Sequence, residues 1–311
     1  MMGRSRHFFV LTPHEDLRQT VLGWWPATEV RWTVFPSGRQ ALEELLAAPP
    51  DLVLVDARLP DMSGFEVVRL IKSENVYRQV PVVVVVDDAG CLQGRDLAAL
   101  ELDDFLVRPL RPVESAVRVL LAYHRAAREL DANPLTKLPG NTSIIHRIQD
   151  LIERREDFAL GYVDLDFFKA FNDAYGFARG DEVLLMTARV LVNSVRGYVQ
   201  GIQFVGHVGG DDFVFIVPEA EVEGVCQRII AHFDAIVPSF YDPEDRERGT
   251  LLSVDRQGRQ QEFPIMAISI AVVFNRGGQL QHFGDASARA MELKKLAKKN
   301  PRSTYVLDQR S

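Results

Sequence analysis

The run VPVVVVV at Val80–Val86 restricts the fold of this chain more than any other segment. It has no polar side chain to turn toward water, so it predicts a strand that is buried on both faces. Over residues 1–111, other short apolar runs alternate with helical patterns. This alternation is typical of a parallel sheet covered by helices on both faces, so we expect a doubly wound α/β domain.

A single long helix is predicted from Pro112 to Asp131, because a proline stands at its start and apolar residues recur at helical spacing. It holds little more than two heptads, so a packed connecting helix and a dimer seam both remain open. The following segment, NPLTKLPGN, is rich in turn-forming residues and marks a boundary. We therefore expect domains over residues 1–111 and 133–311, joined by a helix over residues 112–132.

Residues 133–311 mix strand and helix patterns, which favours an α+β domain. Residues 238–263 are polar and turn-rich, and we expect them to form an inserted loop and hairpin. That insertion is either a surface for a protein partner or a tolerated loop.

Composition excludes several classes of protein. The net charge of −7 argues against nucleic-acid binding, which needs a concentrated basic face. No apolar run approaches the roughly 20 residues that span a bilayer, so no membrane segment is expected. The only two cysteines, Cys91 and Cys226, lie far apart, which fits a reducing compartment. The sequence therefore predicts a cytoplasmic protein.

The segment FVGHVGGDDFVFIV, residues 204–217, joins two apolar runs through two glycines and two aspartates. A tight hairpin turn explains Gly209 and Gly210. It does not explain Asp211 and Asp212, which stand where the second strand should begin, because aspartate is depleted in strands. On these residues alone, a plain turn and a functional site are equally good interpretations.

The segment DLVLVDARLPDMSGFEVVRLIK ends a buried strand at Asp56, where open α/β sheets place their ligand sites. It resembles the receiver domain of response regulators, in which Asp56 would be the phospho-acceptor. The resemblance also calls for an acidic pair, a hydroxyl residue and a lysine. The matching positions hold other residues, namely Thr12 with Pro13, Val86 and Arg108.

These changes favour a pseudo-receiver that docks or dimerises over a phosphorylated switch. Magnesium prefers several oxygen ligands, and Asp56 alone would have to hold it. A shifted register that brings in His14, Glu15 or Asp87 stays open.

Three ordered motifs in the second half are YVDLDFFKAFNDAYGFARGDEVL, GGDDF and KKLAKKN. Together they resemble the GGDEF family, the catalytic module of diguanylate cyclases, over about residues 133–308. The resemblance implies that two GTP molecules are joined across a homodimer into cyclic di-GMP, with release of pyrophosphate. It also implies a Mg²⁺ or Mn²⁺ cofactor. For the fold, it implies a nucleotidyl-cyclase-like domain with a central mixed sheet and flanking helices.

The resemblance assigns a role to individual residues. Asp164 and Asp211 would bind metal, with a backbone carbonyl from Leu165, and Asp212 would act near the attacking hydroxyl. The substrate-binding residues would be Asn172 and Asp181 for guanine, and Phe167, Phe168, Lys169, Lys295 and Lys299 for phosphate. Lys295 and Lys299 are spaced i, i+4 and so share one helical face.

Several positions depart from the family pattern. Asp212 stands where glutamate is usual, and a carboxylate withdrawn by about 1 Å can cost on the order of a hundredfold in rate. Gln200 and Gln203 replace the charged residues of an inhibitory product site, so no feedback inhibition is expected there. Phe177 and Asn133 also differ from the usual His and Asp.

Two functions follow from these motifs. The leading hypothesis is a magnesium-dependent diguanylate cyclase that acts as a homodimer with a receiver-like regulatory domain. The alternative is an adaptor that binds GTP or a cyclic dinucleotide without turnover and contacts a protein partner, through the receiver-like domain or the insertion. Phosphorylation of Asp56 would modify either one.

Overall fold

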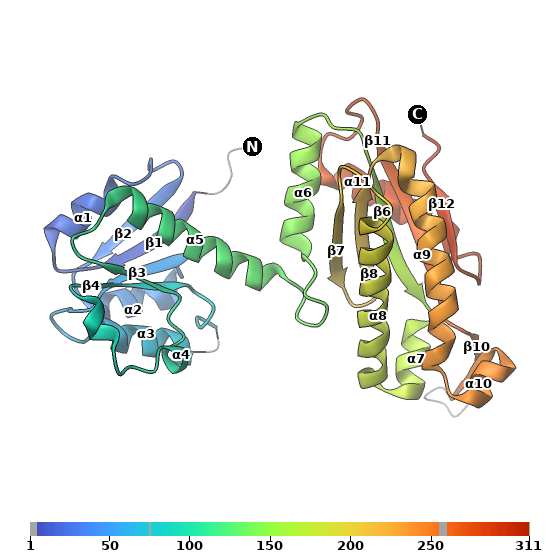
Figure 1. Cartoon of the computed structure of the whole chain (residues 1–311), viewed down its shortest axis with the longest axis horizontal. Helices are drawn as coiled ribbons and strands as arrows, with labels where there is room; N and C mark the ends of the chain where they lie inside the picture. Colours follow the sequence, from blue (N-terminus) through green and yellow to red (C-terminus); the bar gives the residue numbers. More distant parts are fainter. Residues whose placement is uncertain (1–4, 75, 255–259, 311) are drawn as a thin grey trace. The chain divides into compact units, whose positions relative to one another are not determined.

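The apolar runs of the first 111 residues form five parallel strands in the computed structural model, which describes residues 5–74, 76–254 and 260–310 (Figure 1). Across the sheet their order is β2-β1-β3-β4-β5, the doubly wound order of flavodoxin-like folds. The expected fold class is therefore confirmed. The strands are β1 (Arg6–Leu11), β2 (Val30–Phe35), β3 (Leu52–Asp56), β4 (Val82–Val86) and β5 (Asp104–Val107).

Both faces of this sheet are buried, as the valine run predicts. Alternate side chains of β4 belong to two apolar clusters: Val84 lies among residues of α2 and α3, and Val83 among residues of α1 and α5. These helices are α1 (Glu15–Leu22), α2 (Gly38–Ala47), α3 (Gly64–Ser73) and α5 (Pro112–Asp131); a short α4 (Leu97–Leu100) precedes β5.

The long helix α5 has the bounds expected from the sequence. Val119 and Ala122 of α5 are buried against the parallel sheet. The chain accordingly divides into a compact unit over Met1–Leu130 and a second over Asp131–Ser311, so most of α5 counts with the first unit.

The second unit is built on a mixed sheet of order β12-β11-β6-β8-β7. β12 runs parallel to β11, and the other neighbours are antiparallel. This matches the central mixed sheet expected from the sequence. The strands are β6 (Phe158–Asp166), β7 (Phe204–Gly209), β8 (Asp212–Val217), β11 (Ala267–Asn275) and β12 (Thr304–Leu307).

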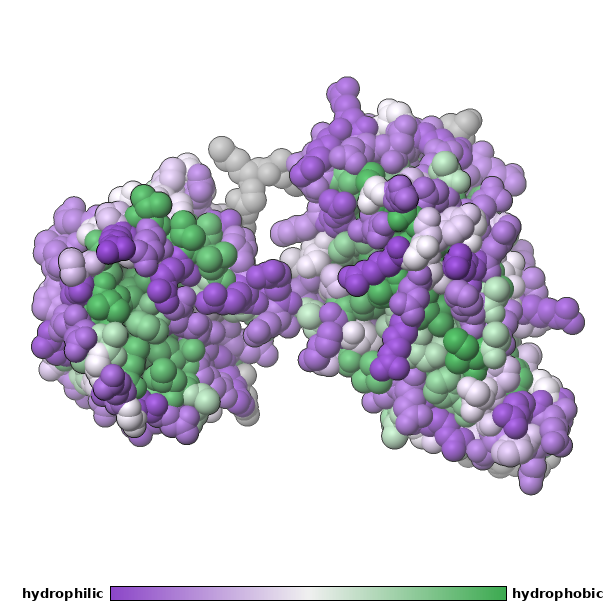
Figure 2. All heavy atoms as spheres, viewed as in Figure 1, coloured by the Kyte–Doolittle hydropathy of each residue, from purple (hydrophilic) through white to green (hydrophobic). Residues whose placement is uncertain are grey.

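Helices cover both faces of the mixed sheet (Figure 1). One cluster of buried residues joins α7, α8 and α9 to the sheet, and another joins α6 and α11 to the opposite face. Hydrophilic side chains cover much of the visible surface of each unit, and patches of apolar residues lie among these side chains (Figure 2). The helices are α6 (Asn141–Glu153), α7 (Phe168–Tyr175), α8 (Phe177–Arg196), α9 (Val222–Ile236) and α11 (Phe283–Ala297).

The insertion at residues 238–263 is less detached than its polar sequence suggests. It holds a short helix, α10 (Pro243–Arg248), and the hairpin of β9 (Thr250–Val254) and β10 (Gln260–Pro264). Tyr241 and Leu251 are buried in the main core of the unit. Residues 255–259 of this segment lie outside the described residues.

No helix in the described ranges is long and apolar enough to cross a membrane.

Candidate functional site

Gly209 ends β7, and Gly210 with Asp211 forms the turn to the antiparallel strand β8, so the hairpin prediction is confirmed. Gly209 and Gly210 have φ angles of 146° and 57°, values that residues with a Cβ rarely adopt. A Cβ on either residue would meet no atom within 4 Å, so the backbone of the turn is open to an approaching ligand.

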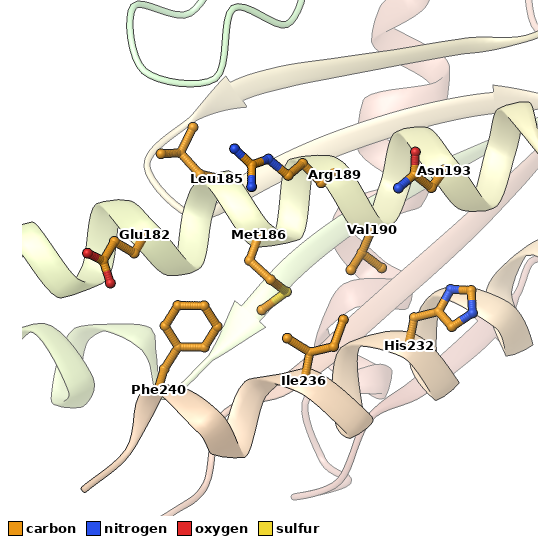
Figure 3. Close-up of a pocket in the computed structure, with 9 residues that line it drawn as sticks. All are labelled: Glu182, Leu185, Met186, Arg189, Val190, Asn193, His232, Ile236 and Phe240. Carbon is orange, nitrogen blue, oxygen red and sulfur yellow. The ribbon is translucent and has the colours of Figure 1, made fainter.

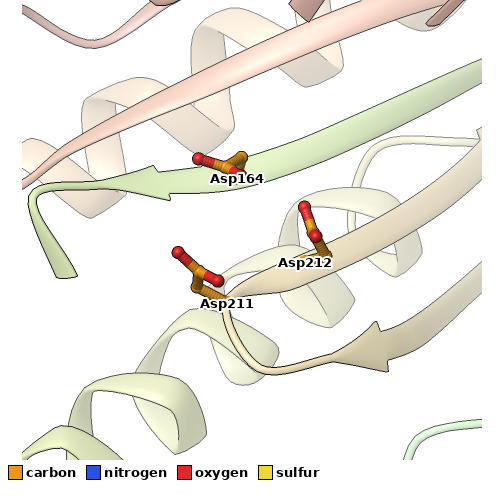
Figure 4. A group of neighbouring side chains, drawn as sticks. All are labelled: Asp164, Asp211 and Asp212. Carbon is orange, nitrogen blue, oxygen red and sulfur yellow. The ribbon is translucent and has the colours of Figure 1, made fainter. Parts of the chain in front are cut away.

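Three aspartates meet beside this turn. Asp164 of β6 lies directly opposite Asp212 of β8 in the sheet, and Asp211 stands in the turn (Figure 4). Their carboxylate oxygens lie within 4.8 Å of one another. Asp164 is buried, with 3% of its surface exposed, and the other two are half-buried. Like charges directly opposite each other destabilise a sheet, so this cluster requires a cation.

Two lysines of α11 supply positive charge to the cluster. The Lys294 ammonium lies 2.5 Å from Asp164 Oδ2 and also contacts Asp212 Oδ1. The Lys298 ammonium lies 2.6 Å from Asp164 Oδ1 and 3.8 Å from Asp166 Oδ1. Burial opposes ionisation of Asp164, but hydrogen bonds from the two lysines outweigh it and lower its pKa.

Asp211 of the cluster and the neighbouring Asp166 have less positive charge beside them than Asp164 has. Burial raises the pKa of Asp211, and the nearby charge of Asp164 raises it further. Asp211 forms no ion pair with any described residue. Burial also raises the pKa of Asp166, although this carboxylate accepts a hydrogen bond of 2.5 Å from Ser269 Oγ. With Asp166 beside it, the three-aspartate cluster sets four carboxylates in all against two ammonium groups.

A helix N-terminus follows the same strand. Phe167, directly after β6, adopts a left-handed conformation with φ of 66° and precedes α7. No side chain caps this end of α7, so its first backbone N–H groups remain available to a ligand. The side chains of Leu165 and Phe168 are buried, and that of Lys169 is exposed.

Asn172 of α7 lies against α8 at Gly180. A Cβ on Gly180 would stand 1.8 Å from Asn172 Oδ1, so only glycine leaves room for this amide. Asn172 Oδ1 is buried and accepts no hydrogen bond from the described residues. A buried acceptor without a partner is costly, which points to a donor supplied by a ligand. Asp181, the next residue of α8, is exposed.

Two known protein families match this chain. The family model described as "Diguanylate cyclase, GGDEF domain" matches residues 131–300, more than half of the chain. The chain belongs to the GGDEF family. A second model, the response regulator receiver domain, matches residues 14–119. The chain therefore joins an N-terminal receiver domain to a GGDEF domain, and both resemblances seen in the sequence are confirmed.

Individual curated proteins resemble parts of this chain. The response regulator PleD of Caulobacter vibrioides is 31% identical over 206 residues, which cover 59% of this chain and 44% of PleD. The diguanylate cyclase DgcP of Pseudomonas aeruginosa is 30% identical over 95 residues, covering 29% of this chain and 14% of DgcP. The chain thus spans less than half the length of these curated relatives.

Solved structures of lower identity also match. The diguanylate cyclase SiaD of Pseudomonas aeruginosa, solved with its activator SiaC, is 22% identical with a TM-score of 0.41, covering 63% of this chain and 72% of SiaD. The coiled coil and GGDEF domain of DgcB from Caulobacter crescentus, solved with c-di-GMP, is 18% identical with a TM-score of 0.44, covering 62% of this chain and 95% of that one.

In the receiver domain, Arg108 fills the pocket around Asp56. Asp56 is 3% exposed at the end of β3, and Arg108 Nη2 donates a hydrogen bond of 2.5 Å to its Oδ2. Thr12 Oγ1 donates a second, of 3.2 Å, to the same oxygen. The other guanidinium nitrogens of Arg108 lie 2.9 Å from Asp16 Oδ2 and 3.5 Å from Asp87 Oδ1. One arginine thus pairs with three carboxylates.

Of the residues that a shifted register could bring in, only Asp87 places a carboxylate beside this pocket, and it pairs with Arg108. His14 Nε2 lies 3.9 Å from Asp56 Oδ2, and Glu15 bonds instead to Arg18 and Gln19. The only group of three or more potential metal ligands within the described ranges is the one in the GGDEF domain.

Two lysines to which the sequence assigned no role lie beside the metal-ligand candidates. Lys294 and Lys298 contact the aspartates, whereas Lys295 and Lys299 are exposed and form no ion pair with the described residues. The sequence held a signal for this register. Leu293 and Ala297 are buried, so the lysine after each lies at the edge of the face that α11 turns toward the sheet.

A histidine that the sequence reasoning missed supports the turn. His207 is buried and stacks on Phe213 with ring centroids 4.1 Å apart. Its Nε2 lies 3.0 Å from the Gly210 carbonyl oxygen, and its Nδ1 lies 2.9 Å from Thr136 Oγ1. A neutral ring that donates from Nε2 and accepts at Nδ1 satisfies both bonds, and burial lowers the pKa of His207.

This environment predicts acid sensitivity of the GGDEF domain. Because the pKa of His207 is below 6.5 in the folded state, the unfolded state binds more protons in that range. The contribution of neutral His207 to the free energy of unfolding is complete above pH 6.5. It is lost as the pH falls from 6.5 toward the lower pKa of the folded state. In calorimetric unfolding between pH 7.5 and 5, the free energy of unfolding should fall less for His207→Gln than for the wild type. The exposed His146→Gln is the control, and equal losses in all three proteins would contradict this role.

A separate groove of about 570 Å³ lies between α8 and α9 (Figure 3). Met186 of α8 and Ile236 of α9 face each other across it, and Phe240 closes one end. The groove shares no residue with the aspartate cluster, so the reactive groups described above do not line it.

Proposed function

We propose that the chain is a diguanylate cyclase that condenses two GTP molecules into cyclic di-GMP and pyrophosphate with the help of Mg²⁺ or Mn²⁺. The observation that carries this proposal is the convergence of Asp164, Asp211 and Asp212 beside an open glycine turn. Membership of the GGDEF family supports it.

The residues present fit a divalent cation. Carboxylate oxygens are the ligands that Mg²⁺ prefers, and the four carboxylates outnumber the two lysines around them. Asp164 and Asp211 would hold the ion, with the backbone carbonyl of Leu165. Bound there, the ion would neutralise triphosphate charge and lower the pKa of the attacking ribose hydroxyl.

The remaining groups bind and orient the substrate. The buried Asn172 Oδ1 would accept a hydrogen bond from guanine, and Asp181 would accept another. The N–H groups of Phe167 and Phe168 would hold phosphate oxygens, because the end of α7 is uncapped. The flexible side chains of Lys169, Lys295 and Lys299 would add charge around the triphosphate.

The reaction requires two copies of the chain. One GGDEF domain offers a single set of these groups and would hold a single GTP, so two domains must face each other to join two nucleotides. A homodimer is therefore part of the proposal.

Incubation of the purified full chain with GTP and Mg²⁺ or Mn²⁺ tests this function. Cyclic di-GMP, identified by mass-resolved chromatography, is the expected product. GTP binding without product at high protein concentration would instead favour the adaptor that signals through a protein partner. The contact of Lys294 with Asp212 is the observation that favours this second candidate, because it ties up the carboxylate nearest the expected reaction.

We also propose that the receiver domain is a pseudo-receiver that is not switched by phosphorylation of Asp56. Arg108 already pairs with this carboxylate and also with Asp16 and Asp87, so a guanidinium stands where Mg²⁺ would have to bind. Intact-mass measurement after incubation with acetyl phosphate and Mg²⁺ should show no phosphoryl adduct. An adduct that is lost in Asp56→Asn would refute this proposal.

Arg108 should then be structural. Arg108→Ala is expected to destabilise the receiver domain by about 3 kcal/mol, because it leaves Asp56 buried without a cation. All three tryptophans, Trp24, Trp25 and Trp32, lie in this domain, so their fluorescence during urea unfolding reports on it alone. Asp56→Asn combined with Arg108→Ala should recover part of the loss. No recovery would mean that Arg108 acts through other contacts.

A further inference from the structure

We infer that Lys294 is a resident cation of the aspartate cluster, whose ammonium group must leave before the cluster can take a divalent ion. The inference rests on the proposed metal site, and it adds a competitor built into the chain itself.

The contacts of Lys294 carry the inference. Its single ammonium group reaches both Asp164 and Asp212, which are two of the three residues that form the candidate metal cluster. These two aspartates stand directly opposite each other on neighbouring strands. A cation between them relieves the repulsion that this pairing creates. The ammonium group thus performs the electrostatic task of a bound metal.

Lysine is suited to a temporary role of this kind. Its charge is compact and sits at the end of a flexible four-carbon stem, so the group can turn to a new partner without moving the helix. The side chain of Lys294 is 27% exposed, which leaves it a route to solvent. The triphosphate of a bound nucleotide would offer it a new anionic partner next to the cluster.

The arrangement predicts coupling between metal and nucleotide. Without nucleotide, a divalent ion must displace the ammonium group, so the metal should bind weakly. A triphosphate that accepts the displaced lysine should strengthen metal binding, and the effect must be reciprocal. Asp211, which has no ion pair among the described residues, remains free to receive the ion first.

Mn²⁺ titration of the full chain, followed by electron paramagnetic resonance without nucleotide, tests the inference. Lys294→Gln should bind Mn²⁺ about tenfold more tightly than the wild type, because a positive charge is removed from the site. Lys137→Gln removes the same charge from an exposed position of the GGDEF domain that has no assigned role, and it should bind Mn²⁺ like the wild type. Equal affinities in all three proteins, or weaker binding by Lys294→Gln, would overturn the inference.

A second measurement does not depend on the variant folding. In the wild type, nitrogen-15 NMR of lysine ammonium groups should show a slowly exchanging signal from Lys294 that is lost as Mg²⁺ is added. The signal of Lys72, whose ammonium group binds Asp103 and two backbone carbonyls, should remain and serves as the internal control. A Lys294 signal that persists at saturating Mg²⁺ would also overturn the inference. Mn²⁺ binding with the expected ranking, but no cyclic di-GMP from GTP, would refute the cyclase proposal and support the role of Lys294.

Discussion

Asp211→Asn is expected to reduce formation of cyclic di-GMP by about a thousandfold or more, because a neutral amide cannot replace a carboxylate as a ligand of a divalent ion. The loss should not come from unfolding. Burial raises the pKa of Asp211, so its charged form is disfavoured in the folded state and costs stability at neutral pH. Removing that charge should leave the midpoint of thermal unfolding unchanged or raise it.

Glu247→Gln is the matched control for this variant. It removes one negative charge from an exposed position on α10, where no contact to the aspartate cluster is seen among the described residues. Product formation by Glu247→Gln should equal that of the wild type. If Asp211→Asn keeps more than a tenth of the wild-type rate while remaining folded, Asp211 does not hold the metal.

The fold was largely accessible from the sequence because its strongest signals are periodic. The valine run of β4 had no polar face, which required a sheet covered on both sides, and Asp56 fell at the end of the next strand in the sheet. The proline at position 112 and the helical spacing of the apolar residues after it predicted where α5 begins and ends. These features depend on local sequence alone, so no knowledge of tertiary contacts was needed.

The insertion shows where composition misleads. Residues 238–263 are mostly polar, and the sequence predicted an exposed loop and hairpin. Tyr241 nevertheless enters the core, and its hydroxyl accepts a hydrogen bond of 2.9 Å from the Met266 backbone N–H. Buried Tyr241 and Leu251 and a bond from Arg179 to Asp242 hold this segment against the domain, and averaging over its residues hides these positions.

The environment of Asp212 could not be read from the sequence for a related reason. The motif showed only that this carboxylate is one methylene shorter than usual. Its contact with Lys294 depends on how α11 is rotated against β8, which the lysine-rich segment alone leaves open. Two features of Asp212 are therefore expected to affect the rate of catalysis: its short side chain and its contact with Lys294.

Gly180→Ala is expected to weaken GTP binding by about tenfold or more while leaving the domain folded. The added Cβ would stand 1.8 Å from Asn172 Oδ1, so the amide must leave its place, and one lost hydrogen bond to guanine is worth roughly this much. Alanine otherwise favours a helix over glycine by about 1 kcal/mol, which limits the loss of stability.

Calorimetric titration with GTP and with ATP separates this effect from a general disturbance of the site. Gly180→Ala should lose affinity for GTP and so reduce its preference for GTP over ATP, because the phosphate-binding groups at the start of α7 are untouched. Asn172→Ala should behave in the same way, and the double variant should be no worse than Asn172→Ala alone. Additive losses in the double variant would show that Gly180 acts independently of the Asn172 amide.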